Sequence, residues 1–174
     1  MADDGAIETL SPVLSDRVER LAVTLLERAD AAGVMLATAE SCTGGMLASL
    51  LTDVDGYGHV FDRGFVVYSE AAKCQLLGLA PEQVDRCGAV SRPVAVAMAE
   101  GALAASDAQI TLAITGFAGP GAPDDEPGLV HFACAREEGE TCHREEHFGD
   151  IGRGEVRLAC LGVALEMMIA ALEA

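Results

Sequence analysis

Apolar residues along the chain recur at two spacings, one typical of helices and one typical of strands. Residues 18, 21, 25 and 26 are apolar at helical spacing, and Ser15 can cap a helix that ends at Gly33. Short, nearly continuous apolar runs, such as 109–114, instead predict strands that are covered on both faces of a sheet. The expected helices are 15–32, 46–51, 70–77, 81–86, 92–105 and 154–173, and the expected strands are 34–37, 64–68, 109–114, 129–136 and 141–148.

The order of these elements predicts the fold class. Strands alternate with helices in the first part of the chain, which is typical of parallel βαβ units. The last two strands are separated only by residues 137–140, which is typical of a hairpin. The sequence therefore predicts a three-layer α/β/α fold with a mixed, mostly parallel sheet. We expect a single domain over residues 15–174, preceded by a mobile tail over residues 1–14.

Composition limits the partners of the chain. Its 174 residues are 51% hydrophobic, enough for one domain with a sizeable core. A formal net charge of −17 argues against nucleic acid and anionic membranes as partners, and no apolar run is long enough to span a bilayer. The six cysteines show no CxxC pairing and residues 1–10 lack the apolar core of a signal peptide, so we expect reduced thiols and a cytoplasmic location. Apolar, alanine-rich helices favour a homo-oligomer.

The stretch 38–45 carries the strongest candidate chemistry. It joins a predicted strand to a predicted helix, where unpaired backbone N–H groups and the helix dipole can stabilise an anion or a developing oxyanion. Ser41 in this turn is a candidate nucleophile, although a serine here equally suits a helix N-cap. Gly44 and Gly45 are costly inside a helix and indicate close approach of a ligand or another backbone. Cys42 is an alternative nucleophile.

A second signal follows the next strand, where Tyr68 precedes Lys73, the only lysine in the chain. A lysine acts as a base only when it is neutral, so its pKa must be lowered by burial or by a neighbouring cation such as Arg153. The alternative is an ordinary surface lysine. Ligands of open α/β sheets bind beyond the carboxyl ends of the strands. We therefore expect the loops 40–45, 68–73 and 115–121 to converge.

Two further features point to an anionic ligand. Glycines 116 and 119, after Thr115, free the backbone to approach a phosphate or a sugar, unless the segment is simply a flexible loop. Arg153 and Arg157 lie four residues apart at the start of the last helix, where they oppose the helix dipole. Their position suits a bound anion, with solvated surface arginines as the alternative.

Histidines and cysteines also gather near the predicted hairpin. His131 and Cys134 are expected on opposite faces of one strand, and so are Cys142 and His143 on the next. Zinc requires ligands that converge. His147 belongs to the same group. We therefore expect no metal site from these five residues.

Five blocks together resemble the C-terminal domain family of the competence/damage-inducible protein CinA, whose stand-alone members include the nicotinamide-nucleotide amidohydrolases (the PncC group). The resemblance runs from about residue 21 to residue 172. It implies hydrolysis of the carboxamide of nicotinamide mononucleotide to nicotinate mononucleotide and ammonia, with no cofactor. The blocks are AESCTGG (39–45), FDRGFVVY (61–68), EAAK (70–73), GAVS (88–91) and TGFAGPG (115–121).

The resemblance also implies residue roles. Ser41 becomes the nucleophile, Lys73 its general base, and Tyr68 a residue that orients or relays the proton. The expected substrate-binding residues are Thr43, Gly44, Gly45, Thr115, Gly116, Gly119 and Arg153. One departure is Glu126, which stands where the family commonly has a lysine. The competing interpretation is a non-catalytic nucleotide-binding or interaction module of the same fold.

Overall fold

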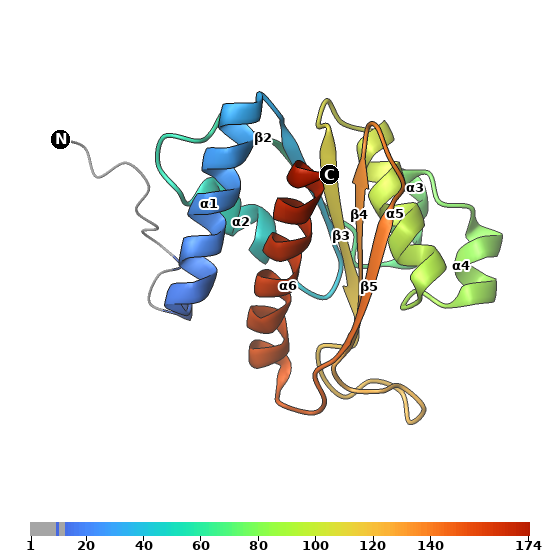
Figure 1. The fold of residues 1–174 in the computed structure, drawn as a ribbon. Coiled ribbons are helices and arrows are strands. Elements are labelled where there is room, and N and C mark those ends of the chain that lie inside the picture. The colour runs from blue at the N-terminus through green and yellow to red at the C-terminus, as the bar shows by residue number, and fades with distance from the viewer. Residues whose placement is uncertain (1–9, 11–12) are drawn as a thin grey trace.

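The chain forms a five-stranded sheet between two layers of helices (Figure 1). The computed structural model describes Leu10 and residues 13–174, so most of the predicted tail lies outside the described residues. The strands are β1 (Leu36–Glu40), β2 (Phe61–Val66), β3 (Ile110–Gly116), β4 (Leu129–Arg136) and β5 (Cys142–His147). The helices are α1 (Asp16–Ala32), α2 (Met46–Thr52), α3 (Glu70–Leu77), α4 (Pro81–Cys87), α5 (Arg92–Ala104) and α6 (Arg153–Glu173).

Each face of the sheet has its own core. Helices α1, α2 and α6 cover one face, and α3, α4 and α5 cover the other (Figure 1). Side chains alternate along β4, so Phe132 packs in the first core while Ala133 packs in the second. The predicted α/β/α layers are therefore confirmed. None of the helices in the described residues is both long and apolar enough to cross a membrane.

The sheet is mixed, with the strand order β2-β1-β3-β4-β5. β1 is parallel to β2 and to β3, whereas β4 is antiparallel to β3 and to β5. The predicted hairpin between β4 and β5 is thereby confirmed, and four strands run in one direction. The carboxyl ends of β1, β2, β3 and β5 consequently lie at one edge of the sheet, where β4 begins.

Three helices begin at serine caps, of which Ser15 was predicted from the sequence. The Ser15 hydroxyl accepts from the N–H of Val18, and Ser69 and Ser91 accept in the same way at the starts of α3 and α5. Gly33 ends α1 in the left-handed conformation with φ 66°. Local sequence therefore sets these helix ends.

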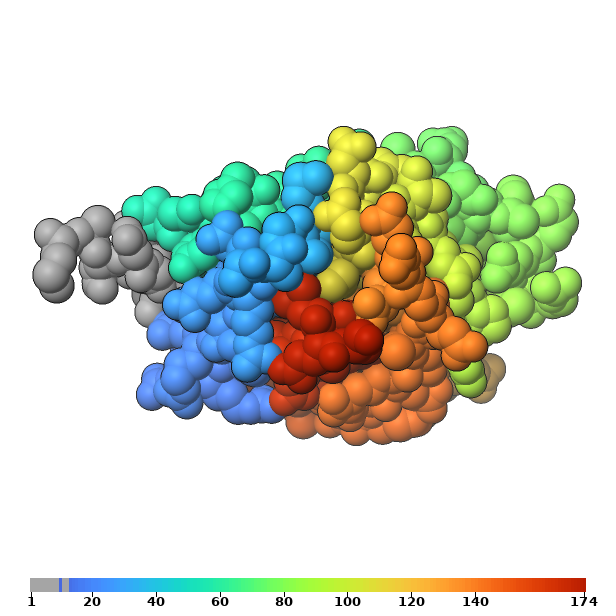
Figure 2. Space-filling model, turned by 45° about the horizontal axis from the view of Figure 1, so that its top comes forward, coloured from blue at the N-terminus to red at the C-terminus, as the bar shows by residue number. Residues whose placement is uncertain are grey.

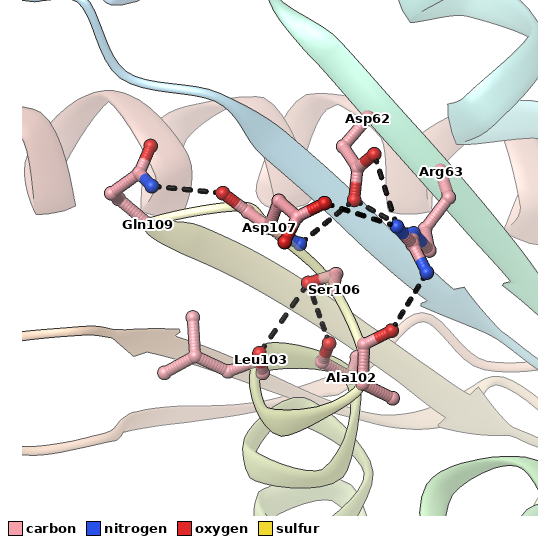
Figure 3. Close-up of polar contacts among 8 residues, drawn as sticks. Asp62, Arg63, Ala102, Leu103, Ser106, Asp107 and Gln109 are labelled. Carbon is pink, nitrogen blue, oxygen red and sulfur yellow. Dashed lines mark hydrogen bonds and ion pairs between the residues drawn. The ribbon is translucent and has the colours of Figure 1, made fainter.

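Two strands differ from the predicted ranges because strand pairing, not the apolar run, sets their limits. β1 continues to Glu40, which pairs with Ile114, and β2 begins at Phe61, although Asp62 and Arg63 are polar. Polar contacts hold this first part of β2 to the connection between α5 and β3 (Figure 3). Arg63 donates to Asp62 at 2.7 Å and to the Ala105 carbonyl at 3.0 Å, and the N–H of Asp107 donates to Asp62 at 3.0 Å.

Helix α6 closes the core from the side of α1. Figure 2 shows its C-terminal end, in red, between α1 in blue and the β4–β5 hairpin in orange. Salt bridges Arg17–Glu166 and Arg28–Glu173 join α1 to α6 along their length. This packing fixes the first turn of α6 beside the carboxyl edge of the sheet.

Candidate active site

Ser41 and Lys73 meet at the carboxyl edge of the sheet. The Lys73 Nζ lies 3.1 Å from the Ser41 Oγ and donates to the Val67 carbonyl at 2.8 Å. Ser41 immediately follows β1 and Lys73 lies in the first turn of α3, so the sheet brings together two residues that are 32 positions apart. The Lys73 side chain is fully buried, and Ser41 is 8% exposed. The expected convergence of these two loops is therefore observed.

Burial lowers the pKa of Lys73. Removal from water disfavours the ammonium form and lowers the pKa of this lysine, which the nearby Cys42 and Glu70 oppose only in part. The proposed neighbouring cation, Arg153, is not among the causes. A neutral amine beside a serine hydroxyl is the arrangement that can accept a proton from it.

The start of α2 is not an open anion site. The buried Glu40 carboxylate accepts from the N–H groups of Gly45, Leu47 and Ala48 at 3.1, 3.1 and 2.8 Å. It therefore occupies the start of α2, where the sequence predicted room for an anion. Ser41 is not the N-cap of this helix either, because Gly45 holds that position.

Some backbone N–H groups of the turn donate hydrogen bonds within the protein and others do not. Gly45 donates to Glu40, and Gly44 donates to the Ser41 carbonyl at 3.1 Å. Within the described residues, the N–H groups of Cys42 and Thr43 donate to no backbone or side-chain oxygen. The donors that remain for a ligand next to the Ser41 hydroxyl are therefore those two amides.

The side chains of Tyr68 and Cys42 do not join the contact between Ser41 and Lys73, which are called the dyad below. Tyr68 reaches Lys73 through its backbone carbonyl at 3.4 Å, while its ring is 70% exposed. Cys42 packs in the core cluster of α1, α2 and α6, and a hydrogen bond with Cys160 lowers its pKa. The thiol of Cys42 therefore faces the core on the far side of the sheet from Lys73's helix.

The glycine-rich loop after β3 lies beside the same edge. The N–H of Ser41 donates to the Ile114 carbonyl at 3.0 Å, and the next residue, Thr115, is buried with its hydroxyl donating to the Ala89 carbonyl at 2.8 Å. A Cβ on Gly116 would stand 2.7 Å from Val130, so close packing against β4 requires this glycine. A Cβ on Gly119 would lie 3.8 Å from the Arg153 guanidinium.

Arg157 is a site residue that sequence reasoning placed on one face with Arg153 but gave no partner. Its guanidinium donates to the Thr43 carbonyl at 2.7 Å and thereby ties α6 to the turn that carries Ser41. Its Nε is buried without a hydrogen-bond partner, and so is the Thr43 hydroxyl. In the sequence, the only indication that Arg157 belongs to the site was its position four residues after Arg153, on the same face of the helix.

Comparison with known proteins places the chain in a family. The sequence model of the CinA C-terminal domain matches residues 18–172. The chain is 46% identical over 134 residues to the nicotinamide-nucleotide amidohydrolase PncC of Escherichia coli, covering 75% of this chain and 80% of that protein.

Solved structures give the same result at the level of the fold. The competence/damage inducible protein CihA of Agrobacterium tumefaciens superposes with a TM-score of 0.89 at 44% identity, over 93% of this chain and 99% of that one. A CinA superfamily protein of Escherichia coli superposes with a TM-score of 0.83 at 32% identity, over 97% of each chain. With nearly the whole chain matched in sequence and in fold, the protein belongs to the CinA C-terminal domain family.

Proposed function

We propose that the protein is an amidohydrolase that converts nicotinamide mononucleotide to nicotinate mononucleotide and ammonia through Ser41 and Lys73. The observation that carries this proposal is the 3.1 Å contact between the Ser41 hydroxyl and the fully buried Lys73 amine. The similarity to a named nicotinamide-nucleotide amidohydrolase supports the substrate class.

The chemistry follows from the two side chains. The neutral Lys73 amine accepts the Ser41 proton while the Ser41 Oγ attacks the carboxamide carbon. The resulting ammonium returns the proton to the leaving nitrogen, which departs as ammonia. Water then attacks the acyl carbon while Lys73 accepts its proton. The bond between the acyl carbon and the Ser41 Oγ breaks, Lys73 returns the proton to this oxygen, and nicotinate mononucleotide leaves.

Stabilisation of the oxyanion falls to the spare amides of the turn. In the part of the chain that the structure describes, the N–H groups of Cys42 and Thr43 donate to no oxygen, unlike those of Gly44 and Gly45. A preorganised donor of this kind contributes about 3 kcal/mol to transition-state stabilisation. Gly44 and Gly45 then serve the site through their positive φ angles of 62° and 92°, which let the turn fold back on Glu40.

The remaining contacts concern the nucleotide. Arg153 lies against Gly119 in the glycine-rich loop, and this guanidinium can pair with the phosphate of the substrate. A chain with a net charge of −17 needs such a local cation to hold an anionic ligand. Thr115 follows Ile114, whose carbonyl accepts from the Ser41 N–H, and Tyr68 orients Lys73 through its carbonyl.

Release of ammonia from nicotinamide mononucleotide tests the proposal. Ser41→Ala removes the nucleophile and is expected to abolish turnover, and Lys73→Arg is expected to lower kcat by about 10²–10⁴-fold because a guanidinium stays charged. Ser49→Ala, at an exposed serine of α2, is the matched control and keeps full activity.

Two results would contradict the proposal. Full activity of Ser41→Ala would end the serine mechanism. Nucleotide binding by the wild-type protein without any release of ammonia would instead favour the non-catalytic binding module.

A further inference from the structure

A cluster of two histidines and a glutamate lies at the edge of the sheet, outside the Ser41–Lys73 site. His131 of β4 is directly opposite Glu145 of β5, and His143 is two residues before Glu145 on the same strand. Residues two apart on a strand share a face, so all three side chains point to the same side of the sheet. Alternation along each strand places each histidine opposite a cysteine, but the sequence-based prediction did not consider that the histidines share a face with Glu145.

The distances within this cluster match those around a metal ion. The His131 Nδ1 lies 3.2 Å from the His143 Nε2 and 3.4 Å from a Glu145 carboxylate oxygen. One donor atom from each of the three residues lies within 4.8 Å of the others. Tetrahedral zinc with bonds of about 2.0–2.2 Å places its ligand atoms about 3.3 Å apart.

Polar contacts of His147 orient the Glu145 carboxylate of the cluster. The His147 ring bridges Glu145 at 3.0 Å and Glu126 at 2.7 Å, so the Glu145 carboxylate is held from the side away from His131. Hydrogen-bonded partners of this kind orient metal ligands in known sites. Glu126 thus contributes negative charge next to the cluster.

Exposure leaves room for a further ligand. His131 is 6% exposed, His143 is partly buried and Glu145 is exposed, so the cluster opens toward solvent at the edge strand. Three protein ligands and an open position are typical of zinc and related first-row metals that keep a bound water.

We infer that His131, His143 and Glu145 form a binding site for a divalent transition metal such as Zn²⁺, with water completing the coordination. The metal site is separate from the Ser41–Lys73 dyad but lies at the same level along the strands of the sheet. Glu40 pairs with Ile114, and Thr115 pairs with His131, so His131 is two strands from Ser41. With neighbouring strands about 4.8 Å apart, that separation is about 10 Å.

Calorimetric titration of Zn²⁺ into untagged protein with reduced thiols tests the inference. We expect one equivalent bound by the wild type, and at least a tenfold loss of affinity in His143→Ala and in Glu145→Gln, both at the exposed edge strand. His147→Gln is expected to weaken binding about 10–100-fold by freeing Glu145. Unfolding temperature should rise with Zn²⁺ in the wild type and not in His143→Ala.

Two matched controls keep the test decisive. His59→Ala removes a histidine that pairs with Asp30 outside the cluster, and Cys142→Ser removes the exposed thiol beside His143, so both should bind Zn²⁺ as the wild type does. Affinity that is unchanged in His143→Ala and Glu145→Gln would overturn the inference. So would affinity that is lost in Cys142→Ser, since the metal would then be held by the thiol.

Discussion

At the scale of single residues, the site depends on two buried ionisable side chains, Glu40 and Lys73, that are stabilised in different ways. Glu40 is fully buried and accepts hydrogen bonds from three backbone N–H groups. Lys73 is also fully buried, and within the described residues its amine contacts carbonyl oxygens and a hydroxyl but no carboxylate. Burial lowers the pKa of Lys73, which favours the neutral amine that a base requires.

This burial has a measurable effect on stability. Because the folded-state pKa of Lys73 lies below the ordinary value of 10.5, the unfolded chain binds a proton that the folded chain lacks between these two pKa values. Over that window the free energy of unfolding of the wild type should rise with pH, by up to about 1.4 kcal/mol per pH unit. Lys73→Met should show no such rise.

Urea unfolding of both proteins from neutral pH to about pH 10 checks this expectation. The difference between wild type and Lys73→Met should move in favour of the wild type as pH increases. Parallel pH profiles for the two proteins would show that the lysine has an ordinary pKa and would remove the physical basis for a neutral amine.

At the scale of elements, the short helix α2 is held in place by β1. Its seven residues include no side-chain cap of their own, and Gly45 at its start has a φ of 92°. The Glu40 carboxylate replaces the missing cap from the end of the neighbouring strand. The turn that carries Ser41 is therefore fixed at both ends by one side chain.

Removing that carboxylate should destabilise the protein. Glu40→Ala leaves three N–H groups at the start of α2 without their acceptor, which we expect to lower the free energy of unfolding by about 3 kcal/mol. Glu27→Ala, at an exposed position of α1, is the control and should change stability by less than about 0.5 kcal/mol. Equal unfolding midpoints for the two variants in urea would refute this role of Glu40.

Strand limits show why element boundaries were harder to predict than helix starts. The caps Ser15, Ser69 and Ser91 bond within three residues, so local sequence contains the whole interaction. β2 begins at Phe61 because it pairs with β1 across a connection of twenty residues (41–60), and no local pattern reveals this pairing.

At the scale of the whole molecule, the homo-oligomer stays a prediction. Tyr68 is 70% exposed, and Val66 and Leu76 are 51% and 52% exposed, which leaves apolar side chains near the end of β2 and on α3 in contact with water. Two copies that each carry a charge of −17 repel one another, so salt should favour their association.

Light scattering after size exclusion tests this expectation. The chain has a mass of 18.0 kDa, and we expect at least twice that mass at moderate ionic strength, decreasing as salt is removed. A mass of one chain at every salt concentration would exclude the oligomer at the concentrations used.

The sequence by itself determined the α/β/α layers, the β4–β5 hairpin, the capped helices, and Ser41 and Lys73 as the residues to examine. These conclusions depend on local patterns and on motifs within a few residues of one another. Only the tertiary structure decided that Glu40 fills the start of α2, that burial and not a cation acts on Lys73, and that His131, His143 and Glu145 converge. The physical reason is that each of these contacts depends on strand order and register, which join residues far apart in the chain.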